Sequence, residues 1–310
     1  MTTAAFASIS PAGLTSRLRD ATSGSLVVLT PNRRLAQSLE AAHDAARVAE
    51  GLASWPAADI LPIDDWTRRL HEESAVDDAV PAPVLLAEEQ EAFVWESVVA
   101  GDRAAAVLVG TAALAREARA AWSLANDWDL DGALGSWEAS DDAQAFARWA
   151  AAWRKRLERE GWIDAAGLAG RAARLLAGKP AGLPQAVVAY AFDILTPAQR
   201  RLLQAARAAG IEVLACAAPE GEARPSRIAL ATPKEEIEFA ARWARARLAS
   251  APATGAGRIG VVVPQLAERR GLVERVFERV LGDARLYEFS LGDIPETVPA
   301  LRARYAQEAP

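Results

Sequence analysis

The 310-residue sequence contains few of the side chains that bind metals or form disulfides: one cysteine, Cys216, and two histidines, His43 and His71. One cysteine cannot form an intramolecular disulfide, and the spacing of a zinc site is absent from the sequence. The sequence therefore predicts no metal. Both histidines stand in helical patterns, His43 among alanines, and we expect both to be solvated or at an edge of the fold.

The chain also lacks an apolar run of the roughly 18 to 20 residues that cross a bilayer. Its N-terminus has no basic stretch followed by an apolar one, so we predict a cytoplasmic protein without membrane contact. The net charge of -6 argues against coating nucleic acid through bulk positive charge, and any such contact must be local. With 73 alanines and three lysines beside 32 arginines, the composition is typical of GC-rich coding, so the arginine content alone indicates no function.

Catalytic motifs are missing as well. The phosphate loop G-x-x-x-x-G-K-[ST] does not occur, and Gly178-Lys179 is followed by Pro180 inside a linker. The glycines within 255–260 precede a predicted strand instead of following it, so they do not form a dinucleotide fingerprint. A nucleophile elbow of the form G-x-S-x-G is also absent. We predict that this chain has no cofactor and no catalytic residues of its own.

Apolar runs of strand length alternate with helical patterns in both end regions of the chain. Strands are predicted at 25–30, 58–63, 186–190, 211–216, 227–231 and 258–263, and helices at 33–50, 197–209, 233–250 and 266–281, with a further helix after Asp64 and Asp65. Such alternation predicts an α/β protein with a mostly parallel sheet covered on both faces. The stretches 26–41 and 259–277 also resemble each other, either as related units or as ordinary strand-to-helix turns.

The middle of the chain has a different pattern. From about 85 to 176 the apolar residues recur at helical spacing without a convincing strand, and eight of the ten tryptophans lie between Trp66 and Trp162. We predict a split α/β domain over 1–80 and 180–232, an all-helical insertion over 81–179, and an incomplete second α/β unit over 233–310. Trp149 and Trp153 share a helix face, which indicates either core packing or a docking surface.

The order of these segments resembles the N-terminal part of the AddB-like DNA repair protein family. The stretches that carry the resemblance are VVLTPNRRLAQSLEAAHDA, WPAADILPIDDWTRRL, VVAYAFDILTPAQRRLL, RIALATPKEEIEFAARWARARL and RIGVVVPQLAERRGLVERVF. Members are large bacterial proteins with a superfamily 1 helicase-like body and a C-terminal PD-(D/E)XK nuclease domain. The resemblance implies a RecA-like parallel sheet that lacks its phosphate loop and carries a helical insertion. It also implies that the chain is a piece of a longer protein.

The resemblance gives the residues after the first predicted strand a role. Thr30, Asn32, Arg33 and Arg34 resemble helicase motif Ia, which holds the DNA backbone at a helix start, where free N–H groups favour phosphate. The alternative is that Asn32 only caps the helix and both arginines are solvated.

Two further sites follow from the same resemblance. Asp193 occupies the place of a degenerate acidic helicase motif, or it caps or orients the turn before Thr196 and Pro197. Arg269 and Arg270 face DNA, an interdomain cleft or solvent.

The resemblance implies a non-catalytic, helicase-like module that contacts the DNA backbone, single-stranded or at ends, without hydrolysing ATP. The parent protein is expected to be an exonuclease, and the implied partners are an AddA-like helicase subunit or the C-terminal nuclease domain. Two alternatives stay open. One is a protein-interaction scaffold with a Trp-rich docking surface. The other is a small-molecule site at the carboxyl ends of the strands.

Overall fold

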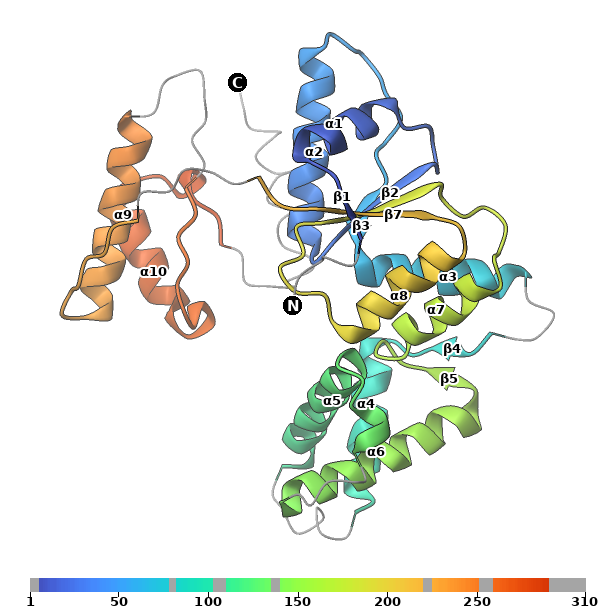
Figure 1. Cartoon of the computed structure of the whole chain (residues 1–310). Coiled ribbons are helices and arrows are strands. Elements are labelled where there is room, and N and C mark those ends of the chain that lie inside the picture. The colour runs from blue at the N-terminus through green and yellow to red at the C-terminus, as the bar shows by residue number, and fades with distance from the viewer. Residues whose placement is uncertain are drawn as a thin grey trace. The chain divides into compact units, whose positions relative to one another are not determined.

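The computed structural model describes residues 6–77, 82–102, 110–134, 140–219, 225–250 and 259–289. The chain divides into two compact units, Met1–Gly221 and Glu222–Pro310 (Figure 1). Each unit is described by itself below.

The first unit is built on a five-stranded sheet in the order β1-β7-β6-β2-β3, in which every paired strand runs parallel to its neighbour. The strands are β1 (Ala7–Ser8), β2 (Leu26–Thr30), β3 (Ile60–Pro62), β6 (Ala186–Tyr190) and β7 (Glu212–Cys216). The predicted α/β class and parallel sheet are confirmed, and the arrangement is compatible with a RecA-like fold. The sequence patterns predicted four of these five strands.

The sequence patterns did not predict the first strand, β1, or the helix that follows it. Strand β1 is followed after two residues by helix α1 (Pro11–Asp20), and β1 pairs with β7 at the edge of the sheet. The signal for α1 is Ser10 followed by Pro11: the Ser10 hydroxyl accepts a hydrogen bond from the Gly13 N–H at 3.1 Å, and Pro is favoured at the first helical position. A two-residue strand leaves too short a pattern to predict.

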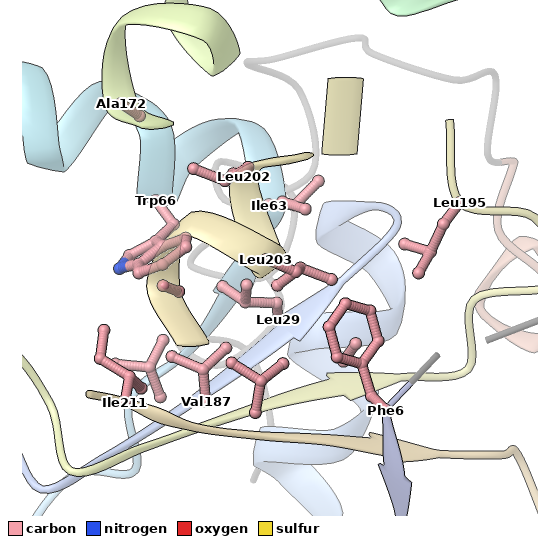
Figure 2. Close-up of a cluster of buried hydrophobic side chains, with 14 of the residues drawn as sticks. Phe6, Leu29, Ile63, Trp66, Ala172, Val187, Leu195, Leu202, Leu203 and Ile211 are labelled. Atoms are coloured by element: carbon pink, nitrogen blue, oxygen red, sulfur yellow. The ribbon is translucent and has the colours of Figure 1, made fainter. Parts of the chain in front are cut away.

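Helices cover both faces of this sheet (Figure 1). Alternate strand residues point to opposite faces, so Leu26 and Val28 of β2 pack with α1 and α2 (Arg33–Ala49). Val27 and Leu29 contribute to the core on the other face, with α3 (Ile63–Asp77), α7 (Leu168–Ala177) and α8 (Pro197–Ala208). In Figure 2 this second core contains Trp66 beside the leucines of α8.

A second set of helices follows α3 in the chain: α4 (Glu88–Ala100), α5 (Thr111–Asp127) and α6 (Asp141–Glu160). They share a separate core that contains Trp95, Trp122 and Trp153. Contrary to the expectation of no strand here, β4 (Val84–Leu85) and β5 (Trp162–Ile163) form a short parallel pair. Two-residue strands carry no detectable periodicity, which is why the helical pattern hid them. The limits of an inserted domain over 81–179 stay a prediction.

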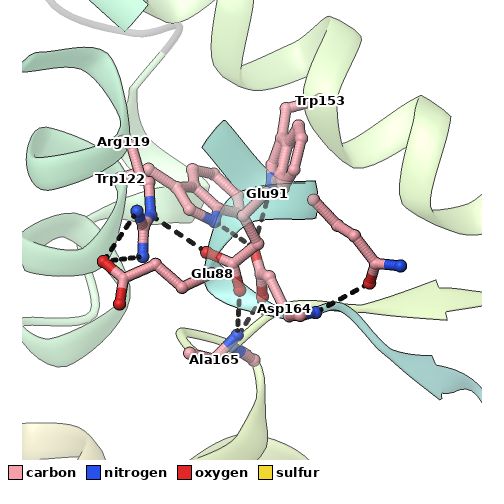
Figure 3. A network of polar contacts seen from close by, with 10 residues as sticks. Glu88, Glu91, Arg119, Trp122, Trp153, Asp164 and Ala165 are labelled. Atoms are coloured by element: carbon pink, nitrogen blue, oxygen red, sulfur yellow. Dashed lines mark hydrogen bonds and ion pairs between the residues drawn. The ribbon is translucent and has the colours of Figure 1, made fainter. Parts of the chain in front are cut away.

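The helical core contains a buried carboxylate. Asp164 is 2% exposed, and its Oδ2 accepts hydrogen bonds from the indole N–H groups of Trp122 at 2.6 Å and Trp153 at 2.7 Å (Figure 3). Its Oδ1 accepts from the Gly167 N–H at 2.8 Å. Trp153 also stacks on Trp95 with the ring centroids 4.5 Å apart. The aromatic face of α6 is therefore largely core, because Trp153 is fully buried and Trp149 partly so.

The second unit contains two packed helices, α9 (Pro233–Ser250) and α10 (Leu266–Leu281), which match the predicted ranges. The strands predicted at 227–231 and 258–263 are wrong for the residues that the structure describes: 227–231 and 259–263 are not paired, and residue 258 lies outside the described residues. A strand requires a hydrogen-bonded neighbour, which the apolar pattern by itself does not guarantee. The incomplete second α/β unit stays a prediction.

Both histidines are buried, which corrects the expectation that they are solvated: His43 is 8% exposed and His71 5%. His71 joins α3 to α7, because its Nδ1 accepts a hydrogen bond from the Arg171 Nε at 2.8 Å. The Arg171 guanidinium also donates to the Ser74 hydroxyl at 3.1 Å. Burial and the Arg171 charge lower the pKa of His71 below its ordinary value, so the imidazole is neutral in the folded protein.

Because neutral His71 accepts a hydrogen bond from Arg171, we expect the protein to lose stability in mild acid. Because the folded-state pKa of His71 lies below the ordinary value of 6.5, the unfolded chain binds the proton more readily. The contribution of neutral His71 to the free energy of unfolding is therefore complete above about pH 6.5. It is lost as the pH falls through the folded-state pKa. In the His71→Asn variant the side-chain oxygen can still accept from Arg171 without titrating. Urea unfolding at pH 7.5 and 5.5 should show a smaller loss for this variant than for the wild type.

The control for this experiment is His43→Asn, which removes the other histidine of the sequence. Glu72, whose charge acts on His71, is the same in every variant. Identical pH profiles for His71→Asn and the wild type would contradict the assignment.

Candidate functional site

The sheet has a topological switch point between β2 and β6. From β2 the chain continues to β3 on one side, and from β6 it continues to β7 on the other. Strand β2 is followed by α2 on one face, whereas its neighbour β6 is followed by α8 on the other. The two strands are in register from Leu26 beside Ala186 to Leu29 beside Ala189, so they end at the same level. The carboxyl ends of two such strands form the crevice in which open α/β sheets bind ligands.

The turn after β2 holds four of the residues singled out in the sequence. Thr30 is fully buried, and its hydroxyl donates to the Asn32 carbonyl oxygen at 2.9 Å. The Asn32 side chain caps α2, because its Oδ1 accepts from the Leu35 N–H at 2.9 Å. Thr30 and Asn32 therefore fix the turn and the start of α2.

Arg33 and Arg34 are the first two residues of α2, and both are exposed. Arg33 contacts the Asp65 carboxylate of α3 at 3.3 Å, with the Arg33 side chain 69% exposed. None of the residues in the first turn of α2 is acidic. Two cationic side chains at a helix N-terminus oppose the helix dipole by roughly 0.3 to 1 kcal/mol each, and a bound anion would relieve that repulsion.

The turn after β6 lies beside the first. Ala191 has a left-handed backbone with φ of 56°, and its N–H donates to the Cys216 carbonyl of β7 at 2.8 Å. Asp193 and Ile194 are exposed. The cap of α8 is Thr196, because the Thr196 hydroxyl accepts a hydrogen bond from the Gln199 N–H at 3.2 Å. The structure therefore brings Asp193 to the same edge of the sheet as the turn after β2.

The other predicted contact residues belong to the second unit. Arg269 and Arg270 are in the first turns of α10 in the second unit, and the Arg270 guanidinium lies 5.4 Å from the centroid of the Phe289 ring.

Acidic residues that the sequence analysis did not assign to the site lie next to it. Asp64 and Asp65 open α3 directly after β3. Partial desolvation and the Asp65 charge raise the pKa of Asp64, and desolvation and the Asp64 charge raise the pKa of Asp127, at the end of α5. Asp64 and Asp127 are 63 residues apart in the sequence, so no local pattern could have predicted this proximity.

Within the described ranges there is no group of three or more His, Cys, Asp or Glu side chains that could hold a metal ion. Nor does any helix in these ranges have the length and apolar character needed to cross a membrane. A scan of the chain against protein-family models and a search of curated proteins found no match.

Proposed function

We propose that the first unit is a non-catalytic, helicase-like module that holds the backbone of single-stranded DNA at the carboxyl ends of β2 and β6. The observation that carries this proposal is the pair of exposed arginines, Arg33 and Arg34, on the first turn of α2 at the switch point of the sheet. Phosphate is a ligand that both the dipole at a helix N-terminus and guanidinium groups favour.

The turn after β1 supports a role without ATP hydrolysis. It contains two residues, Ile9 and Ser10, between the end of β1 and the start of α1. A Cβ atom at Gly13 would lie 2.9 Å from the Ile9 side chain, so the start of α1 packs directly on the turn. A phosphate loop needs a longer glycine-rich segment whose N–H groups surround a phosphate.

The proposed place of the module is in a larger AddB-like repair exonuclease, with an AddA-like helicase subunit or a nuclease domain as partner. The alternative of a Trp-rich docking surface has less support, because Trp95, Trp122 and Trp153 are buried in the helical core. A module that contributes only backbone contacts is expected to bind weakly, without sequence preference, and with strong salt dependence.

The test is the double variant Arg33→Ala/Arg34→Ala. We expect its affinity for a fluorescein-labelled oligothymidine, measured by anisotropy at low salt, to fall about tenfold or more. Loss of two phosphate contacts should also make the slope of log K against log salt shallower by about 1.4, since each contact contributes roughly 0.7 on single strands. The melting temperature should change little, because both side chains are exposed.

The matched control is Arg17→Ala/Arg19→Ala, which removes the same charge from the last turn of α1. These arginines pair with Glu212 and Glu50 in exposed ion pairs that contribute little to stability. Unchanged affinity and an unchanged salt slope in the Arg33/Arg34 variant would refute the proposed function.

A further inference from the structure

An exposed tryptophan lies at the end of α5. Trp128 is 45% exposed and directly follows the last helical residue, Asp127. Among the tryptophans with a described side chain, only Trp243 of the second unit is similarly exposed, at 44%. Trp95, Trp122 and Trp153 are buried in the helical core, so Trp128 differs from these tryptophans in its exposure.

The position of Trp128 is fixed by its neighbours on both sides. Its backbone N–H donates to the Leu124 carbonyl at 3.0 Å, which continues the helical pattern. The next residue, Asp129, has a left-handed backbone with φ of 58° and forms an ion pair at 2.5 Å with Arg201 of α8. The end of α5 is therefore attached to the helix that starts at the carboxyl end of β6.

Acidic side chains of α3 and α5 lie between this tryptophan and the arginines of α2. Arg33 contacts Asp65 at 3.3 Å, and Asp65 is next to Asp64 in the first turn of α3. The Asp64 carboxylate acts on the charge of Asp127, the residue before Trp128. The ion pair of Asp129 with Arg201 places the end of α5 beside the first turns of α8, which follow the turn after β6 at the proposed phosphate site.

The charges along this edge favour one orientation of a bound strand. The α2 end of the edge carries Arg33 and Arg34, which attract phosphates. The α5 end carries Asp127, which repels them. A strand that places its phosphates at the arginines directs its bases toward the α5 end. An indole ring there provides a flat apolar surface for an unpaired base.

Building on the proposed function, we infer that Trp128 stacks on a base of the strand whose backbone is held at Arg33 and Arg34, which makes the site selective for single-stranded over duplex DNA. In a duplex the faces of the bases are already stacked on each other, so the indole has nothing to contact. Stacking on any base explains why the site would be tolerant of sequence.

The experiment uses the full chain and three fluorescein-labelled probes of equal length: oligothymidine, an abasic strand with the same phosphates, and a duplex. Trp128→Ala should bind oligothymidine about fivefold or more weakly than the wild type, with an unchanged salt slope. On the abasic strand both proteins should bind equally, because that probe contains no base to stack. Trp128→Phe retains an aromatic ring and should recover most of the affinity.

The control is Trp243→Ala, which removes a tryptophan of similar exposure from the second unit and should bind oligothymidine within twofold of the wild type. If Trp128→Ala binds oligothymidine normally while Arg33→Ala/Arg34→Ala binds it weakly, the stacking role is overturned and the backbone site stands. An equal loss by Trp128→Ala on oligothymidine and on the abasic strand also overturns stacking. If Arg33→Ala/Arg34→Ala has no effect, the proposed function fails, and this inference fails with it.

Discussion

Replacing Asp164 with alanine is expected to lower the free energy of unfolding by about 3 to 5 kcal/mol. The carboxylate is 2% exposed and accepts hydrogen bonds from two indole N–H groups and one backbone N–H. Alanine would leave the three donors, on Trp122, Trp153 and Gly167, without that acceptor in the protein interior. Each buried donor without a partner costs roughly 1 to 3 kcal/mol, and part of this cost is recovered if water enters.

Urea unfolding followed by tryptophan fluorescence measures this effect directly, because two of the donors are indoles. The matched control is Asp131→Ala, in the same helical segment, whose side chain is 43% exposed and lies 3.7 Å from Arg154. That variant should stay within about 0.5 kcal/mol of the wild type. If the Asp164 and Asp131 variants unfold at the same urea concentration, the buried carboxylate does not stabilise the helical core as described.

Replacing Trp66 with alanine is the second change with a large expected effect, also about 3 to 5 kcal/mol. Trp66 is 2% exposed and lies in the core between α3 and the sheet, in the cluster that contains Leu29 and Leu203 (Figure 2). Its removal loses the burial of a large aromatic side chain and leaves a cavity that the surrounding helices can only partly fill.

Thermal and urea unfolding of Trp66→Ala should both show the lower stability of this variant. Phe93→Ala is the matched control, because Phe93 is an aromatic residue of the same unit that is 74% exposed on α4. We expect that variant to differ from the wild type by less than about 0.5 kcal/mol. A Trp66 variant as stable as the Phe93 variant would show that this part of the core tolerates the cavity.

The parts of the fold that could be predicted are those with local patterns. The apolar runs that form β2 and β6 have strand length, and the run of β2 stops at Pro31. Helices α2, α8, α9 and α10 begin and end within one residue of the predicted limits. For α2 and α8, the polar caps Asn32 and Thr196 mark the helix starts.

The parts that could not be predicted depend on contacts distant in the sequence. Asp164 accepts from Trp122, 42 residues away, and no spacing rule indicates such a pair. The run at 259–263 has the composition of a strand, but in the described part of the second unit it has no strand partner. Composition sets the tendency to extend, whereas a neighbouring backbone decides whether a strand forms.

The candidate site was predictable in part. The residues of the turn after β2 could be identified from a strand that ends at a helix start. Their location at the switch point required the order of the strands, which the sequence does not state. The positive φ of Ala191 and the nearness of Asp64 to Asp127 were also inaccessible, because alanine gives no signal for a left-handed backbone.

The pair formed by β4 and β5 has a consequence for how the chain could change over evolution. Val84 lies beside Trp162 in a parallel pair. The two ends of the segment that contains α4, α5 and α6 are therefore one strand spacing apart, about 5 Å. The span between these two residues can therefore change in length without moving α3 or α7, the helices on either side of it in the sequence, as long as the contact of Asp129 with Arg201 of α8 is kept. Variation in size among homologous proteins is expected to concentrate in that span, while the distance between the two paired residues stays constant.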